Sequence, residues 1–166
     1  MVPMRLHIPV SLRWSDLDAY QHVNNVEMLD LLQEARIEAF WRHEDVVDPL
    51  PTAVVDSGPT ASTHTFVAHQ EIEYLRPLEY TRRPILVEMW FGKLGGASIE
   101  VCYAVHDGRP GGVATSGDPL DSAPYVRAST TLVLVDAATG SPRRITDTER
   151  AVWEPYLDEP VKFRRR

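Results

Sequence analysis

Residues 13–25 have the sequence Arg-Trp-Ser-Asp-Leu-Asp-Ala-Tyr-Gln-His-Val-Asn-Asn, a polar stretch that joins a predicted strand to a predicted helix. The strand, Arg5–Trp14, alternates apolar and polar side chains, which is the period of a half-buried strand. The helix, from Val26 to about Arg42, has apolar side chains at three- and four-residue steps. Asn24 is a suitable N-cap for this helix, and Glu27 three residues later resembles the second half of a capping box.

Strands dominate the rest of the prediction. Prolines and a glycine mark residues 45–62 as a loop, and the glycines of residues 92–96 indicate a hairpin turn. Alternating patterns predict strands, the first three in meander order, at His64–Leu75, Arg83–Phe91, Ala97–His106 and Tyr125–Val135. A short C-terminal helix is predicted at Thr146–Leu157. We therefore expect an α+β fold in which one long central helix is wrapped by a curved antiparallel sheet of about five strands. Residues 1–166 are expected to form a single domain, with a flexible insertion at 107–124 and a tail at 158–166.

The composition excludes several classes of protein. The 166 residues hold 17 Lys and Arg against 24 Asp and Glu, and the net charge of −7 disfavours a nucleic-acid-binding protein. A single cysteine, Cys102, excludes an internal disulfide and a cysteine-cluster metal site, so we expect a reducing, cytoplasmic location. No apolar stretch reaches the roughly 20 residues that cross a membrane, and the N-terminus lacks the apolar run of a signal peptide.

The loop before the helix carries the residues best suited to catalysis. Unpaired N–H groups and a partial positive charge at a helix start can polarise a carbonyl oxygen. A carboxylate and an imidazole in the same loop, Asp18 and His22, then fit hydrolysis or acyl transfer. The same residues also fit a structural role, with Asp16 and Asp18 in Asx turns and Asn24 as a cap. The spacing fits neither a calcium loop nor a zinc site, and we expect no metal.

The sequence resembles hotdog-fold acyl-CoA thioesterases, most closely those of the 4-hydroxybenzoyl-CoA thioesterase type. Those proteins have an Asp-x-Asp loop that leads into a central helix. The motifs that carry the resemblance are residues 13–25, Glu34-Ala35-Arg36, Glu71–Leu78 and Gly95–Ser98. The loop is also similar to that of plant acyl-ACP thioesterases, where Asn stands in the position of Tyr20.

The resemblance implies specific roles for residues of the loop. Asp18 matches the catalytic carboxylate of the family, acting as general base or nucleophile, and the thioester carbonyl is expected to bind at a helix N-terminus. His22 matches a histidine implicated in the acyl-ACP enzymes, and Asn25 stands where bacterial relatives often have His or Tyr. We expect His22 and Asn25 to orient Asp18, water or the carbonyl, and Tyr20 and Asn24 to contact the substrate.

Hydrolysis of acyl-CoA is the activity that the resemblance implies, with no cofactor other than the CoA of the substrate. The CoA phosphates require local positive charge, for which Arg82, Arg83, Lys93 and the tail Arg164–Arg166 are candidates. The resemblance also implies a homodimer or a dimer of dimers. Two alternatives remain: a hydratase or dehydratase acting on acyl thioesters, and a non-catalytic acyl-CoA-binding module.

Overall fold

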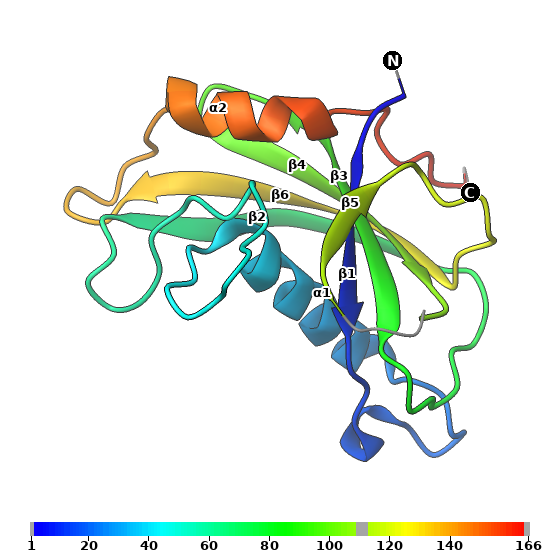
Figure 1. Ribbon diagram of the computed structural model, residues 1–166. Helices are drawn as coiled ribbons and strands as arrows, with labels where there is room; N and C mark the ends of the chain where they lie inside the picture. The colour runs from blue at the N-terminus through cyan, green and yellow to red at the C-terminus, as the bar shows by residue number, and fades with distance from the viewer. Residues whose placement is uncertain (1, 109–112, 165–166) are drawn as a thin grey trace.

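Six strands form one antiparallel sheet in the computed structural model, which describes residues 2–108 and 113–164. The strands lie in the order β2-β6-β4-β3-β1-β5 across the sheet. Their bounds are Arg5–Val10 (β1), Thr63–Tyr74 (β2), Ile85–Leu94 (β3), Ser98–His106 (β4), Thr115–Gly117 (β5) and Val126–Asp136 (β6). Helix α1 (Asn25–Phe40) lies along one face of this sheet, and the shorter α2 (Asp147–Trp153) lies near the turn that joins β3 to β4 (Figure 1). The predicted α+β class is confirmed.

Strand β1 is shorter than the predicted Arg5–Trp14. It ends at Val10, and residues Trp14–Asp16 form a 3-10 helix, η1. The Asp16 carboxylate accepts a hydrogen bond from the Arg13 backbone N–H at 2.6 Å, which turns the chain out of the extended conformation. The alternation of side chains still orients β1, because Leu6, Ile8 and Val10 are buried in the core.

Helix α1 starts where the sequence predicted. The Asn24 side chain accepts a hydrogen bond from the Val26 N–H at 2.8 Å, so the predicted N-cap is confirmed, whereas Glu27 contacts Arg13. The expectation of one long central helix is corrected. α1 is a short helix of 16 residues, and its exposed Gln33 and Glu34 show that the sheet covers it from one side. The side that packs on the sheet consists of Met28, Leu31, Leu32, Ala35, Ala39 and Phe40.

Two details of the predicted sheet were wrong. The described residues form six strands because part of the 107–124 segment pairs with β1 as β5. β2 does not lie beside β3 in a meander but pairs with β6 at the edge of the sheet. The reason is the 75–84 connection, which passes the start of α1, where the Val23 N–H donates to the Leu78 carbonyl at 2.8 Å. The predicted hairpin of β3 and β4 is confirmed.

Aromatic side chains join the helices to the sheet. The ring of Phe40 on α1 lies 5.4 Å from Phe91 on β3 and 5.6 Å from Trp153 on α2, measured between centroids. Trp153 is fully buried and donates its indole N–H to the Thr52 carbonyl at 3.0 Å. The predicted C-terminal helix is present as α2, followed by a 3-10 helix, η2 (Glu154–Tyr156).

The other face of the sheet is contacted by the insertion and the tail. The Leu120 N–H donates to Glu88, and Trp90 donates its indole N–H to the Glu159 carbonyl at 2.8 Å. The predicted insertion and tail extend over residues 109–112, 165 and 166, which lie outside the described residues, and the flexibility of the insertion stays a prediction. Within the described ranges, no helix is long and apolar enough to cross a membrane.

Candidate active site

The first aspartate of the loop is structural. Asp16 is fully buried, and its carboxylate accepts hydrogen bonds from the Arg13 guanidinium at 2.8 and 3.1 Å. The Asp16 carbonyl accepts the Asn24 N–H at 2.7 Å, which closes the loop onto the residue that caps α1. Asp16 therefore fixes the loop relative to the helix.

The second aspartate holds a tight turn and keeps one oxygen available. Asp18 Oδ1 accepts the N–H groups of Tyr20 at 2.8 Å and His22 at 3.3 Å, and the Asp18 N–H donates to the His22 carbonyl at 2.8 Å. Gln21 adopts a φ of 65°, the left-handed conformation that this turn requires. Asp18 Oδ2 has no hydrogen-bond partner among the described residues, and the side chain is only partly buried. The Asx-turn role and a chemical role are thus compatible, because they use different oxygens.

The loop is attached to a second segment, residues 78–80. His22 forms an isolated β-bridge with Glu79, and the Trp14 ring stacks on Tyr80 with centroids 4.3 Å apart and planes inclined by 14°. The predicted CoA contacts Arg82 and Arg83 follow directly along the chain, and both are exposed.

Lys93 is not brought to the same place. Val10, which precedes the loop, pairs with Ile85 at the start of β3, whereas Lys93 lies at the far end of that strand. Ile85 and Lys93 are eight residue steps apart on this strand, and at about 3.3 Å per step the distance between them is roughly 26 Å. Within one protomer, Lys93 is therefore remote from Asp18.

The start of α1 completes the arrangement. The Asn24 side chain accepts a hydrogen bond from the Val26 N–H. The N–H groups of Asn25 and Glu27 have no acceptor within the described part of the chain. The Tyr74 hydroxyl donates to the Asn25 carbonyl at 2.7 Å, which ties β2 to the helix start. Free N–H groups at a helix start bind an anion or a carbonyl oxygen. The Tyr20 and Asn25 side chains are both exposed.

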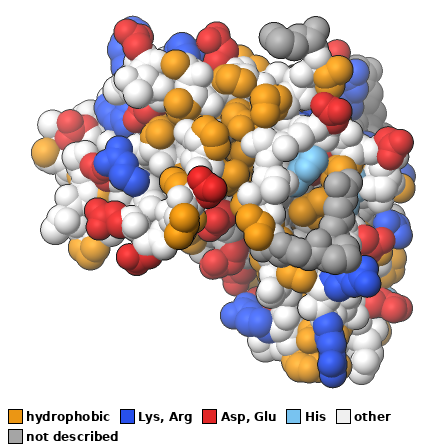
Figure 2. Space-filling view, in the orientation of Figure 1, with side chains coloured by type: hydrophobic (Ala, Val, Ile, Leu, Met, Phe, Trp, Pro, Cys, Tyr) orange, Lys and Arg blue, Asp and Glu red, His pale blue; other side chains and the backbone are white. Residues whose placement is uncertain are grey.

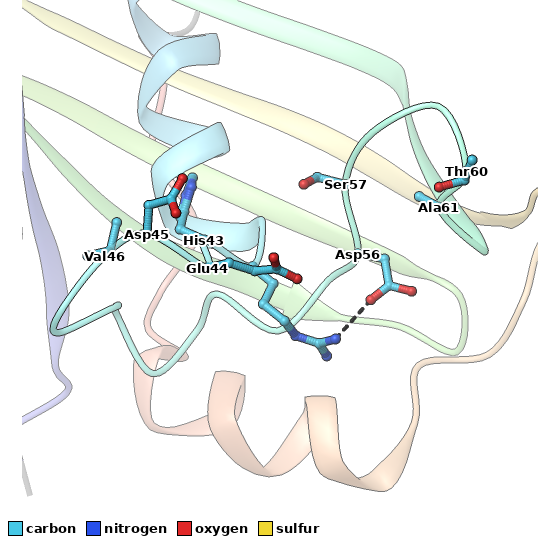
Figure 3. Close-up of a pocket in the computed structure, with 9 residues that line it drawn as sticks. His43, Glu44, Asp45, Val46, Asp56, Ser57, Thr60 and Ala61 are labelled. Atoms are coloured by element: carbon cyan, nitrogen blue, oxygen red, sulfur yellow. Dashed lines mark hydrogen bonds and ion pairs between the residues drawn. The ribbon is translucent and has the colours of Figure 1, made fainter.

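Two cavities flank the other end of α1. One, of about 560 Å³, lies between the segments 42–46 and 56–61, where Arg42 pairs with Asp56 at 3.0 Å (Figure 3). Its lining is largely polar and charged, and it is far from Asp18 along the helix. A smaller cavity of about 210 Å³ lies between α1 and β2. It is lined by Gln33, Arg36, Ile37, Phe40, Trp41, Thr65, Val67 and Leu132.

A buried ionic cluster on the opposite face was not predicted from the sequence. Glu88 is 1% exposed and lies 3.0 Å from the Arg5 guanidinium and 3.5 Å from His106 Nε2. Its carboxylate also accepts the Leu120 N–H at 2.6 Å, and His106 Nδ1 lies 2.8 Å from the Ser122 hydroxyl. Burial opposes ionisation of Glu88, but the interactions with His106, the Leu120 N–H and Arg5 together lower its pKa. The only signal in the sequence was a charged residue within an otherwise apolar strand.

Among the described residues, the remaining reactive groups do not form a second centre near the loop. Within the described residues, no group of three His, Cys, Asp or Glu side chains is placed to hold a metal ion. Cys102 is buried in β4, and burial raises the pKa of its thiol to about 11. Acidic and basic side chains are interspersed around a central group of hydrophobic ones on the face shown in Figure 2, consistent with a surface of mixed charge.

The comparisons with known proteins agree with this architecture. The fold matches that of a predicted thioesterase from Bacillus stearothermophilus over 95% of this chain and 99% of the other, with a TM-score of 0.70 at 16% identity. A thioesterase from Thermus thermophilus, complexed with coenzyme A and Zn, matches over 94% of this chain and 96% of its own, with a TM-score of 0.61 at 24% identity. No curated protein gives a significant sequence match. The sequence model of the thioesterase-like superfamily matches residues 12–161, and the chain therefore belongs to this superfamily and has its hotdog fold.

Proposed function

We propose that the protein hydrolyses acyl-CoA thioesters at the start of α1. The family supports thioester hydrolysis in general, and the finer assignment is carried by one observation. A carboxylate oxygen of Asp18 without a partner among the described residues lies in a turn that is tied, through Asp16 and Asn24, to unpaired helix N–H groups. The coenzyme A held by the Thermus neighbour supports CoA as the thiol part of the substrate.

In the proposed mechanism, Asp18 acts on the thioester carbonyl carbon, either through a water molecule that it deprotonates or by direct attack. The helix N–H groups of Asn25 and Glu27 stabilise the negative charge that develops on the carbonyl oxygen. The carbon–sulfur bond then breaks, and the CoA thiolate takes up a proton, from Asp18 in the water-assisted route and from solvent in the direct route. Direct attack leaves an anhydride between the acyl group and Asp18, which a water molecule hydrolyses to release the free acid and regenerate the carboxylate. His22 and Asn25 orient the carboxylate, the water or the carbonyl, and Tyr20 contacts the substrate. The reaction uses no cofactor.

The acyl group is proposed to follow α1 toward the cavity between this helix and β2. Tyr74 fastens β2 to the helix start, and nine residues earlier on the same strand Thr65 lines the cavity. Ile37, Phe40 and Leu132 give the cavity an apolar lining. An apolar acyl chain gains free energy there by leaving water.

A second copy of the chain is proposed to complete the site, in a homodimer or a dimer of dimers. β2 is an edge strand that pairs only with β6 among the described strands, so its other side presents backbone groups to a partner. Val67 on this strand lines the cavity and is 45% exposed, which a partner strand would cover. The molar mass in solution tests the shared site, and a monomer at the assay concentration would contradict it.

A thiol-release assay tests the proposed activity. Purified protein is given short, long and aromatic acyl-CoAs, and free thiol is measured together with the absorbance of an enoyl-CoA substrate. Thiol release supports hydrolysis. Loss or gain of enoyl absorbance without thiol release indicates a hydratase or dehydratase, and binding without either reaction indicates an acyl-CoA-binding module. Parallel reactions with acyl-ACP identify the carrier. A cytoplasmic location, proposed from the lone Cys102, is tested by fractionation.

A further inference from the structure

Trp14 is placed unusually for a tryptophan. One face of its indole stacks on Tyr80 at 4.3 Å, yet the residue is 70% exposed. Tryptophan is one of the largest apolar side chains, and leaving it in water forgoes much of the free energy of its burial. A flat, exposed ring that is held rigid by a second ring is well suited to stacking on a planar ligand.

This aromatic pair lies beside the candidate active site. Trp14 begins η1, which leads through Asp16 into the Asp18 turn, and Tyr80 follows Glu79, the bridge partner of His22. Trp14 and Asp18 are four positions apart, and four residue steps span at most about 14 Å. The pair is therefore within the reach of one extended ligand bound at Asp18.

Positive charge lies next to the same pair. Arg82 and Arg83 follow Tyr80 and Thr81, and both are exposed. Neither guanidinium has a carboxylate partner among the described residues, whereas Arg13 is occupied by Asp16 and Glu27. In a chain with a net charge of −7, two such arginines are suited to bind phosphate.

We propose that Trp14, stacked on Tyr80, binds the adenine ring of CoA and that Arg82 and Arg83 bind its phosphates. The adenine lies on the exposed face of the indole, and the pantetheine arm leads from there to Asp18. This inference rests on the proposed function, because it assigns the nucleotide end of the same substrate. It also explains how an acidic protein binds a ligand with several negative charges.

The test compares two thioesters with the same acyl group, one of CoA and one of N-acetylcysteamine, which lacks the nucleotide. The measured quantity is the ratio of kcat/KM for the two. Trp14→Ala is expected to lower this ratio roughly tenfold, the scale of one base–aromatic stack. Trp14→Phe keeps a ring and is expected to retain most of the ratio. Phe66→Ala, which removes another aromatic side chain, 55% exposed on β2, is the matched control and should leave the ratio unchanged.

An unchanged ratio in Trp14→Ala, or equal losses for both thioesters, would overturn the inference. If Trp14→Ala does not fold, the double variant Arg82→Ala, Arg83→Ala tests the inference instead. It should lower the kcat/KM ratio of the two thioesters and weaken the dependence of that ratio on salt. If the wild type turns over neither thioester, the proposed hydrolysis fails. Calorimetry then tests the proposed nucleotide site by itself, by measuring the affinities of CoA and of pantetheine, which lacks the nucleotide. CoA should then bind more tightly than pantetheine, and Trp14→Ala should lower the ratio of the two affinities roughly tenfold. Equal affinities of the wild type for CoA and pantetheine would contradict the proposed adenine site.

Discussion

Replacing Glu88 with glutamine is expected to destabilise the protein substantially. The carboxylate is 1% exposed, and it joins β1 through Arg5, β4 through His106 and the insertion through the Leu120 N–H. Glutamine has nearly the same shape and retains an oxygen that can accept the Leu120 N–H. The variant therefore isolates the loss of the negative charge.

The magnitude follows from what remains beside Arg5. Removing one partner of a buried ion pair costs about 3–5 kcal/mol when the other charge is left alone. Arg5 retains Asp158, whose carboxylate lies 2.6 Å from the guanidinium, so the lower end of that range applies. For a chain of this size, about 3 kcal/mol corresponds to a decrease in Tm of roughly 6–12 °C. Asp158→Asn, which removes the more exposed partner, should cost about 1 kcal/mol.

The assay is thermal unfolding of wild type, Glu88→Gln and Asp158→Asn at pH 7 and at successively lower pH. The pKa of Glu88 is lowered on folding, so its charge stabilises the folded state at neutral pH, and that stabilisation is lost as the pH falls below about 4.5. His7 and His106 also face this carboxylate and are present in both proteins. The difference in Tm between wild type and Glu88→Gln should therefore narrow in acid. Equal Tm values at pH 7, or a difference that widens below pH 4.5, would refute the reasoning.

Three further outcomes are expected. Asn24→Ala removes the cap of α1 and should lower the unfolding free energy by about 1 kcal/mol, or 2–4 °C in Tm; a Tm equal to that of the wild type would show that the cap contributes nothing. Trp153→Ala leaves a cavity between α1, α2 and the sheet and should cost about 3–5 kcal/mol in denaturant unfolding, whereas less than about 1 kcal/mol would contradict the packing. Cys102, with a pKa of about 11, should react slowly with a thiol reagent at pH 8 in the native protein and rapidly in urea, and rapid native labelling would show that the thiol is accessible.

The local parts of the fold could be predicted because their signals lie close together in the sequence. The cap at Asn24 and the alternation of β1 depend on neighbours within four residues, and both are present. The position of β2 depends on contacts across the fold, such as the bond between Val23 and Leu78, so the order of strands was predicted only in part. β5 has only three residues in a glycine- and proline-rich segment, which is too short for an alternating pattern.

The candidate site shows the same division. The Asx turn at Asp18, which the sequence predicted as one alternative, is present. The sequence could not show that Asp16 is buried and structural, or that Asp18 Oδ2 has no hydrogen-bond partner among the described residues. The stacking of Trp14 on Tyr80 joins residues 66 positions apart, and nothing in either segment predicts it. The Glu88 cluster likewise brings together side chains from three strands.

The central claim, that Asp18 is the carboxylate that hydrolyses the thioester, is tested most directly by Asp18→Asn. The amide oxygen can still accept the N–H groups of Tyr20 and His22, so the turn and the Tm should be retained. Loss of the carboxylate should lower kcat for thiol release from acyl-CoA by at least about 10²-fold, the usual contribution of a positioned base. Wild-type thiol release by folded Asp18→Asn would contradict the account.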